Sequence, residues 1–489
     1  MNLSVALSSA QSSLSATATQ TSIISRNITG AADPGYSRKL GMTSSLGLGG
    51  VKLVSVGRAA DTALFLRMLD ATSAASSQEA LLKGLNQLER TIEDPELNHS
   101  VAASIGKVTN AVQMLAETPS DPVLAASLLA ASYDLAGALN AATGEVQGVR
   151  QTADAAMAES VERINTILAQ FETVNRAVIV GTQAGTDVTD SLDARDRLLS
   201  SLSEEVGISV ITRSNNDIAI YTDSGVTLFE KSARAISFDR TYTYDATTTG
   251  AAVFADGVPL TGPAATMGIK SGALFGNATI RDQVTVTYQL QLDEIARGLI
   301  AAFAESDPSD PPVLPDAPGL FTYPGAPAML PPGVAATGLA GLISVTADAD
   351  PAKGGDLNRL RDGGLAGPGY VYNAGGDAGY SDRLQGLLAS LGAQQTFDPQ
   401  SQTNPNSTLS RFASSSVSWL ESARQAAGIE ANQRTTFLER TSDALSNLTG
   451  VNLDEELALM MELERSYGAS ARIITAVDNM LQMLLQATR

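Results

Sequence analysis

The sequence predicts an elongated, multidomain α+β protein, with terminal coiled-coil helices and a long helical-bundle domain that carries a β-rich outer insertion. Three observations support this prediction. Heptad-spaced apolar residues occur at both ends of the chain. Between residues 121 and about 180, apolar residues recur every three or four positions, as in one long helix. Period-two alternation is confined to residues 207–268, so the strands are expected to form one insertion.

The N-terminal heptad pattern alternates spacings of four and three over nearly four heptads. Its members are Leu3, Leu7, Ala10, Leu14, Thr17, Thr21, Ile24 and Ile28. Many of them are small, which permits close approach of a partner helix. The pattern predicts a coiled-coil strand, although an ordinary amphipathic pair packed within the chain would give the same spacing.

The C-terminal stretch 450–485 predicts a helix that begins at Asn452 as N-cap, with acidic residues in its first turn. Its apolar residues follow two interleaved registers. The first comprises Leu453, Leu457, Met460, Tyr467, Ala471, Ile474, Leu481 and Leu485, and the second Leu459, Leu463, Ile473, Val477, Met480 and Leu484. Two adjacent registers make an apolar face too wide for one neighbouring helix.

The segments in between predict further helices, loops and short strands. Helices are expected at 61–92, 101–115, 121–180, 187–207, 274–303, 382–391 and 409–448, and an extended or hairpin connection at 40–57. Strands are expected at Ile208/Val210, Ile218/Ile220, Val226/Leu228, Ile236/Phe238 and Tyr242/Tyr244, with one more around Leu342, Ile343 and Val345. Nine prolines between Pro308 and Pro332 indicate a loop.

This order predicts nested, discontinuous domains. The expected units are a terminal coiled-coil domain (1–56 with 450–489), a helical rod (57–206 with 269–305 and 381–449), a β-rich outer domain (207–268), and a Pro/Gly-rich insertion with short strands (306–380). The insertion is expected to pack with the outer domain.

Composition excludes several function classes. The formal charge of −20 argues against nucleic-acid binding, which needs a basic surface. There are no cysteines and one histidine, His99, so neither a catalytic triad nor a Cys/His metal site is expected, and no cofactor is expected. No run approaches the length of a membrane span, and the first residues lack the pattern of a secretory signal peptide, so no membrane contact is expected.

Charge is uneven along the chain. Residues 1–60 carry five basic residues and one acid (+4), and residues 451–489 carry three basic residues and six acids (−3). This complementarity is consistent with pairing of the two ends.

Four aspartates, Asp187, Asp190, Asp193 and Asp196, recur every three residues. One interpretation is a carboxylate site of an acidic enzyme. The preferred one is helix charges paired with Arg195 and Arg197, so that no catalytic residue is expected. Replacing Asp190 and Asp193 with Asn would abolish activity in the first case and be near neutral in the second.

Both ends resemble one family. The segment "SRNITGAADPGYSRK" is similar to the N-terminal signature of bacterial flagellar axial proteins at Asn27, Ile28, Gly35, Tyr36, Ser37 and Arg38. The stretch 450–485 resembles the C-terminal signature of that group at Gly450, Val451, Asn452, Leu453, Asp454, Glu455, Tyr467, Ala469, Ala471 and Arg472. The segments 187–210 and 340–355 are similar to the hook-associated junction members of the family.

The resemblance implies a structural, non-enzymatic role. Such proteins leave the cell unfolded through the flagellar type III apparatus, assemble as a ring at the hook tip, and join hook to filament. The implied partners are further copies of the chain, the hook protein, a second junction protein, and an export chaperone at the C-terminal helix. Another axial role, as flagellin or the second junction protein, is the alternative.

The terminal helices are the expected assembly interface. We expect one C-terminal register to face residues 3–28 of the same chain and the other to face neighbouring subunits. The expected interface residues are Leu3, Leu7, Leu14, Ile24, Asn27, Ile28, Tyr36, Leu457, Met460, Leu463, Tyr467, Ile474, Val477, Leu481 and Leu484. We also expect the terminal segments to be largely disordered in the isolated monomer, because an unpartnered seam forfeits the burial that stabilises it.

Overall fold

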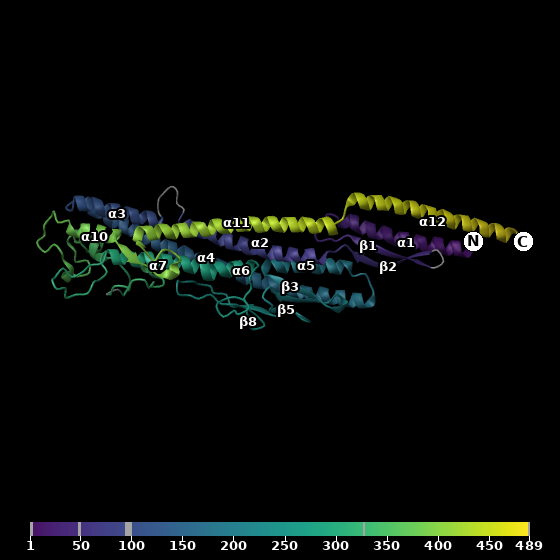
Figure 1. Cartoon of the computed structure of the whole chain (residues 1–489), viewed down its shortest axis with the longest axis horizontal. Coiled ribbons are helices and arrows are strands. Elements are labelled where there is room, and N and C mark those ends of the chain that lie inside the picture. Colours follow the sequence, from purple (N-terminus) through teal and green to yellow (C-terminus); the bar gives the residue numbers. More distant parts are fainter. Residues whose placement is uncertain (1–2, 47–49, 93–99, 326–327, 488–489) are drawn as a thin grey trace.

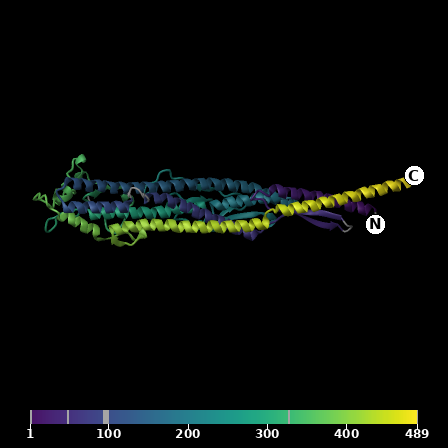
Figure 2. The ribbon, with the colours of Figure 1, turned by 90° about the horizontal axis from the view of Figure 1, so that it is seen from above.

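The computed structural model describes residues 3–46, 50–92, 100–325 and 328–487. Figures 1 and 2 show a long, narrow molecule with both termini at one end. Helices run along its length and the small sheets lie at its side, as expected for an elongated α+β protein. His99 lies outside the described residues.

The terminal unit, residues 3–58 with 453–487, projects from one end of the molecule. It contains α1 (Leu3–Gly30), the antiparallel hairpin β1 (Lys39–Leu46) and β2 (Gly50–Arg58), and α12 (Leu453–Ala487). Asn452 caps α12 as predicted, because its Oδ1 accepts the N–H groups of Asp454 and Glu455. Helix α1 packs along α12 and against the hairpin, so the two ends of the chain pair.

The rod is a bundle of long helices. Its elements are α2 (Thr62–Leu88), α3 (Val101–Glu117), α4 (Pro122–Ala184), α5 (Thr189–Glu205), α6 (Ala273–Thr279), α7 (Thr285–Ala302), α10 (Asp382–Gly392) and α11 (Leu409–Thr449). A π-helical segment, Ile280–Val284, joins α6 to α7. Side-chain caps begin α2, α3, α4 and α11, at Asp61, Ser100, Asp121 and Thr408. The spacing of apolar residues predicted these helices from the sequence. The capping side chains determine where four of them begin.

Helix α4 is a single unbroken helix of 63 residues, which at 1.5 Å per residue spans about 95 Å. Gly137, Gly144 and Gly148 do not interrupt it, and a Cβ added at any of them would meet nothing within 4 Å. One 18-residue window of α4 reaches a mean hydropathy of 1.4, enough for a membrane span by length and composition. The expectation that no such run exists was therefore wrong, although buried residues along α4 pack into the cores of the rod and of the β part.

The β part forms two small antiparallel sheets beside α4 and α5. One holds β3 (Ile208–Thr212), β4 (Ile218–Thr222) and β5 (Thr227–Phe229), and the other β6 (Ile236–Phe238), β7 (Val253–Ala255) and β8 (Val258–Pro259). Phe171 of α4 meets Phe229 edge-on at 5.0 Å between ring centroids. The strand expected at Tyr242 and Tyr244 is absent, because that segment runs along α4, where the Tyr244 hydroxyl donates to Asp154.

Residues 306–380 pack on the rod rather than with the β-rich segment, which corrects that expectation. They contain β9 (Phe321–Thr322), α8 (Leu339–Leu342), β10 (Ser344–Val345) and α9 (Arg359–Asp362), and the nearby hairpin comprises β11 (Gln394–Thr396) and β12 (Asn406–Thr408). The α7 carboxylate Asp293 accepts the N–H groups of Gly338 and Ala340, and Phe321 lies edge-on to Phe303. These contacts hold the segment against α7. Leu342 ends a helix, so the strand expected there is limited to Ser344–Val345.

Candidate assembly interface

Asn27 is the centre of a buried hydrogen-bond network at the end of α1. Its Nδ2 donates to the backbone oxygen of Lys39 and to Glu456 Oε2, each at 3.0 Å. Its Oδ1 accepts the Lys39 N–H at 2.8 Å and the Tyr36 hydroxyl at 3.0 Å. All four hydrogen-bonding positions of the amide are thus used, as a side chain only 1% exposed requires.

The turn after α1 has the shape that this network demands. A Cβ at Gly30 would lie 2.6 Å from the Tyr36 ring, so only glycine lets the ring cross the end of the helix. Burial raises the pKa of Tyr36 to about 12, so its hydroxyl remains a donor well above neutral pH. The residues that match the axial-protein signature, among them Asn27, Gly35, Tyr36 and Arg38, therefore lie at the end of α1 and in the turn that this network holds.

Arg38 and Glu456 join the two ends of the chain. Arg38 Nε donates to Glu456 Oε1 at 2.6 Å, and its Nη1 lies 3.2 Å from Glu455. Glu456 is 1% exposed, and its buried carboxylate is paired with the charge of Arg38 and accepts a hydrogen bond from Asn27. The complementary charge of the two ends therefore does lead to ion pairs between them. Within the described part of the chain, only one of the five basic residues of the N-terminal segment, Arg38, makes these pairs.

Three other basic residues of that segment bind α5 instead. Lys39 is buried and its Nζ contacts Asp193. Arg58 lies 2.8 Å from Asp193 and 2.6 Å from Asp196. We call this contact between the terminal unit and α5 the joint.

Arg26 completes the joint on its exposed side, 2.9 Å from Asp187 and 2.8 Å from Asp190. Burial alone would raise the pKa of Asp187, but hydrogen bonds from Arg26 and Thr189 outweigh it and leave the pKa lowered. The three-residue spacing thus places Asp190, Asp193 and Asp196 on the face of α5 that meets the terminal unit, and Asp187 lies just before the start of the helix.

The expected partners of these aspartates were wrong. Arg195 points inward, donating to Asn175 and to the backbone oxygen of Asn216, and burial lowers its pKa to about 10. Arg197 contacts Asp33 and the Gly35 carbonyl. The four aspartates are each paired with a cation of the terminal unit, which is a structural use.

The expected interface residues of α1 and its turn lie in the terminal unit. Ile24 and Asn27 are buried, and Leu3, Leu7, Leu14, Ile28 and Tyr36 are half-buried. Ile23 and Ala16, outside the heptad series, are also buried, because α1 packs on the hairpin as well as on α12.

On α12, the buried stripe takes members of both apolar registers. Val477 is buried, Met460, Leu463 and Ile474 are half-buried, and Ser470 meets Ser13 of α1 at 3.1 Å between hydroxyl oxygens. The assignment of one register to α1 was therefore wrong. The seam runs between the two registers, where a small polar contact lets the helices approach closely.

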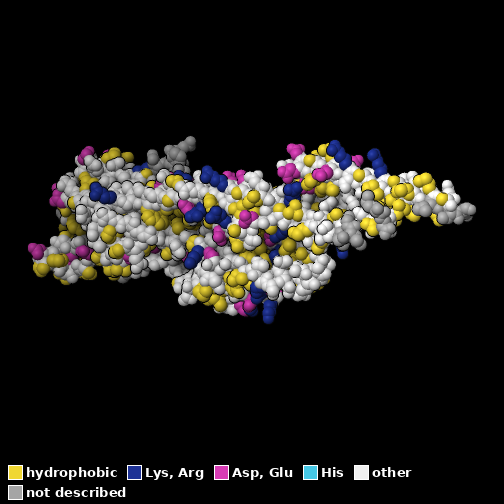
Figure 3. All heavy atoms as spheres, turned by 45° about the vertical axis from the view of Figure 1, so that its right-hand side comes forward, with side chains coloured by type: hydrophobic (Ala, Val, Ile, Leu, Met, Phe, Trp, Pro, Cys, Tyr) yellow, Lys and Arg dark blue, Asp and Glu magenta, His cyan; other side chains and the backbone are white. Residues whose placement is uncertain are grey.

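Beyond this seam, α12 exposes large apolar side chains along its whole length, which together we call the apolar stripe. Its members, each at least 40% exposed, are Leu453, Leu457, Leu459, Met461, Tyr467, Ile473, Met480, Leu481, Met483 and Leu485. Figure 3 shows hydrophobic side chains gathered on the projecting terminal end. The Leu484 side chain lies outside the described part. A stripe of this extent on one helix is typical of an interaction surface.

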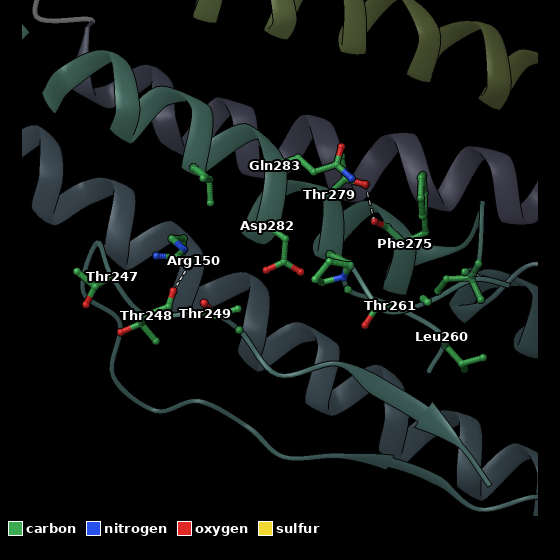
Figure 4. Close-up of a pocket in the computed structure, with 18 of the residues that line it drawn as sticks. Arg150, Thr247, Thr248, Thr249, Leu260, Thr261, Phe275, Thr279, Asp282 and Gln283 are labelled. Atoms are coloured by element: carbon green, nitrogen blue, oxygen red, sulfur yellow. Dashed lines mark hydrogen bonds between the residues drawn. The ribbon is translucent and has the colours of Figure 1, made fainter. Parts of the chain in front are cut away.

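Elsewhere, a pocket of about 540 Å³ lies between α4, α6 and the loop after β6 (Figure 4). Its charged lining residues have structural partners: Arg150 donates to the backbone oxygens of Asp245 and Thr248, and Asp282 pairs with Arg281. Its other labelled residues are mainly threonines and apolar side chains. The lining offers no arrangement of nucleophile and base.

Sequence reasoning missed the residues that complete the joint and the Asn27 network, namely Lys39, Arg58 and Glu456. Two signals pointed to them: the excess of basic residues before position 60 and the regular aspartates of α5. Neither signal identified the partner, because the ion-paired residues lie more than 130 positions apart in sequence.

Comparison with known proteins finds similarity to components of the bacterial flagellum. Residues 85–307 match the model of the helical domain of the flagellar hook-associated protein FlgK, and residues 446–487 match that of the C-terminal segment of flagellar basal body rod proteins FlgEFG. Flagellar hook-associated protein 1 of Salmonella typhimurium is 23% identical over 241 residues, which are 47% of this chain and 43% of that protein. The Escherichia coli K12 protein of the same name is 24% identical, over 44% of its length.

The matched segment thus spans less than half the length of these curated relatives. The solved structure of the flagellar hook junction protein FlgK from Burkholderia pseudomallei is similar over 78% of this chain and 99% of that one, with a TM-score of 0.56 and 13% identity. This similarity confirms the fold. Together, the matches confirm the resemblance seen in the sequence. Residues 85–307 are therefore similar to the helical domain of the flagellar hook-associated protein FlgK, and residues 446–487 to the C-terminal segment of flagellar basal body rod proteins.

Proposed function

We propose that this chain is a structural subunit of the bacterial flagellum that joins hook to filament. The single observation that carries the proposal is the pairing of α1 with α12, which leaves a long apolar stripe of α12 uncovered. The names of the similar proteins, hook-associated protein 1 and hook junction protein, support the position at the junction.

In this proposal the terminal unit is the polymerising part and the rod holds it in a fixed direction. Further copies of the chain cover the apolar stripe, and the hook protein and the second junction protein bind at the two ends of the resulting ring. The chain reaches this place outside the cell by type III export, with a chaperone on α12 beforehand. The same apolar stripe serves both, because an exposed stripe needs cover before assembly as well as after it.

A role as another axial protein, such as flagellin, is the second candidate. The C-terminal match to rod proteins is compatible with any axial protein. The FlgK helical-domain match over residues 85–307 favours the junction. The proposal assigns no catalytic step to the chain.

The test replaces Ile473 and Met480, two members of the exposed stripe, with Asp. We expect the double variant to fold but to leave filaments unattached, because neighbouring copies can no longer cover the stripe. Val123→Asp is the matched control, since Val123 is 72% exposed but lies on α4, far from the terminal unit. Normal filament attachment with the double variant would refute the proposal.

A further inference from the structure

A groove of about 890 Å³ lies where the joint meets the rod. Its half-buried lining is partly apolar, with Phe65 and Met68 of α2 and Leu438 and Leu445 of α11. An apolar groove at the boundary of two units is a typical place for another chain to bind. We call it the joint groove.

The exposed lining of the joint groove carries uncompensated negative charge. Glu204, Glu439 and Asp443 line it, and among the described residues none of them has an ion-pair partner. The two arginines of the lining are already used: Arg58 binds Asp193 and Asp196, and Arg197 contacts Asp33. The groove thus favours an apolar ligand flanked by positive charge.

Helix α12 offers such a surface on its exposed side. Met461, Glu464, Arg465, Gly468, Ala469 and Arg472 line a shallow depression, which we call the helix notch. Arg465 and Arg472 are two turns apart on one face, about 10 Å along the axis, and neither has an ion-pair partner among the described residues. Gly468 and Ala469 between them admit a side chain from another helix, and Met461 is 56% exposed.

The two surfaces cannot meet within one chain. They share no lining residue, and α12 leads away from the groove after its first turn (Figure 1). A contact between different patches on identical chains is heterologous, so its repetition builds a ring or a helical array. An assembly of this kind is what the proposed function requires.

We propose that the helix notch of one copy binds the joint groove of the next copy. Met461 enters between the apolar side chains of α2 and α11, while Arg465 and Arg472 pair with Glu439, Asp443 and Glu204. This inference rests on the proposed function and specifies which surface covers part of the apolar stripe.

Engineered cysteines test the contact, because the chain has none of its own. Ala469→Cys in the notch and Ser442→Cys beside the groove are combined in one full-length chain, and isolated flagella are oxidised mildly. We expect a ladder of disulfide-linked oligomers on a non-reducing gel. Each single variant should give no ladder. The matched control combines Ala469→Cys with Ser418→Cys. Ser418 is exposed on α11, like Ser442, but lies about 24 residues before it.

Charge reversal supplies the second readout. Arg465→Glu with Arg472→Glu should abolish the ladder, and so should Glu439→Arg with Asp443→Arg. All four changes together should restore it. A ladder no stronger than in the Ser418 control, or no recovery in the combined variant, would overturn the proposed contact. If Ile473→Asp with Met480→Asp still stops filament attachment in that case, the proposed function stands and only the contact fails.

Discussion

Asn27 and Glu456 are 429 residues apart in sequence, and their side chains meet at 3.0 Å in the interior of the terminal unit. Through this bond the end of α1 is tied to the first turn of α12. The same amide holds the backbone of Lys39, whose side chain reaches α5. One residue therefore links the pairing of the two chain ends to the joint that fixes them on the rod.

Asn27→Ala should loosen the terminal unit selectively. It leaves the Lys39 N–H, the Lys39 carbonyl and part of Glu456 unpaired, which costs about 1–3 kcal/mol for each buried group. Amide exchange should accelerate in α1 and in the first turns of α12 and stay unchanged in α4. Thr29→Ala, an exposed change on the same helix, is the control. Unchanged exchange in α1 would show that the network is dispensable.

Asp193→Asn should destabilise the joint strongly. It removes the carboxylate between Lys39 and Arg58 and leaves the buried Lys39 ammonium with only the more distant, exposed carboxylate of Asp190 at 3.7 Å, which costs about 3–5 kcal/mol. Asp190→Asn should cost less than about 1 kcal/mol, because the Asp190 side chain is 71% exposed. The expectation that both substitutions are near neutral in a structural protein is thus corrected for Asp193. Chemical denaturation of the two variants compares them directly, and equal effects would contradict the joint.

Acid should weaken the Arg26 side of the joint. The Asp187 pKa is lowered in the folded chain, so its stabilising contribution is complete above its ordinary value of 3.8 and is lost as the pH falls below that value. Exchange protection at the start of α5 should therefore decline below about pH 4. In Asp187→Asn this part of the pH dependence should disappear. A decline of the same size in that variant would assign the effect to other groups.

In the isolated monomer, α1 and α12 should exchange faster than α4. The seam between α1 and α12 is built largely from small or half-buried residues, among them Ala10, Thr17 and Ser470, and the apolar stripe of α12 has no cover. Helices with so little burial are marginal in water. Hydrogen exchange followed by mass spectrometry measures this. Protection across residues 3–28 as strong as that of α4 would contradict it, and assembly should raise protection at both ends.

Much of the fold could be predicted from sequence, because helices and strands follow from patterns within short segments of the chain. Helical periodicity located every long helix, and the alternation around Ile208 and Ile218 located the first sheet. The strands at Val253 and Val258 were not predicted, because they are too short to show an alternation of apolar and polar residues. The packing of residues 306–380 on the rod depends on Asp293 and Phe303, which nothing within that segment reveals.

The candidate interface was predictable only in part. The two ends could be matched by heptads and by charge, and Asn27 and Tyr36 through the family signature. The sequence could not predict which side of α12 faces α1, because both registers are equally apolar. The side of α12 that faces α1 is marked by two polar residues, Ser470 and Glu456, which form hydrogen bonds to α1.

The most direct test of the account is the position of this chain on isolated flagella, measured by gold labelling of an epitope placed in the exposed loop near Val313. The account predicts label at a single point between hook and filament, and none on flagella from the variant with Ile473→Asp and Met480→Asp. Label distributed along the filament, or absent from flagella that contain the unaltered chain, would contradict it.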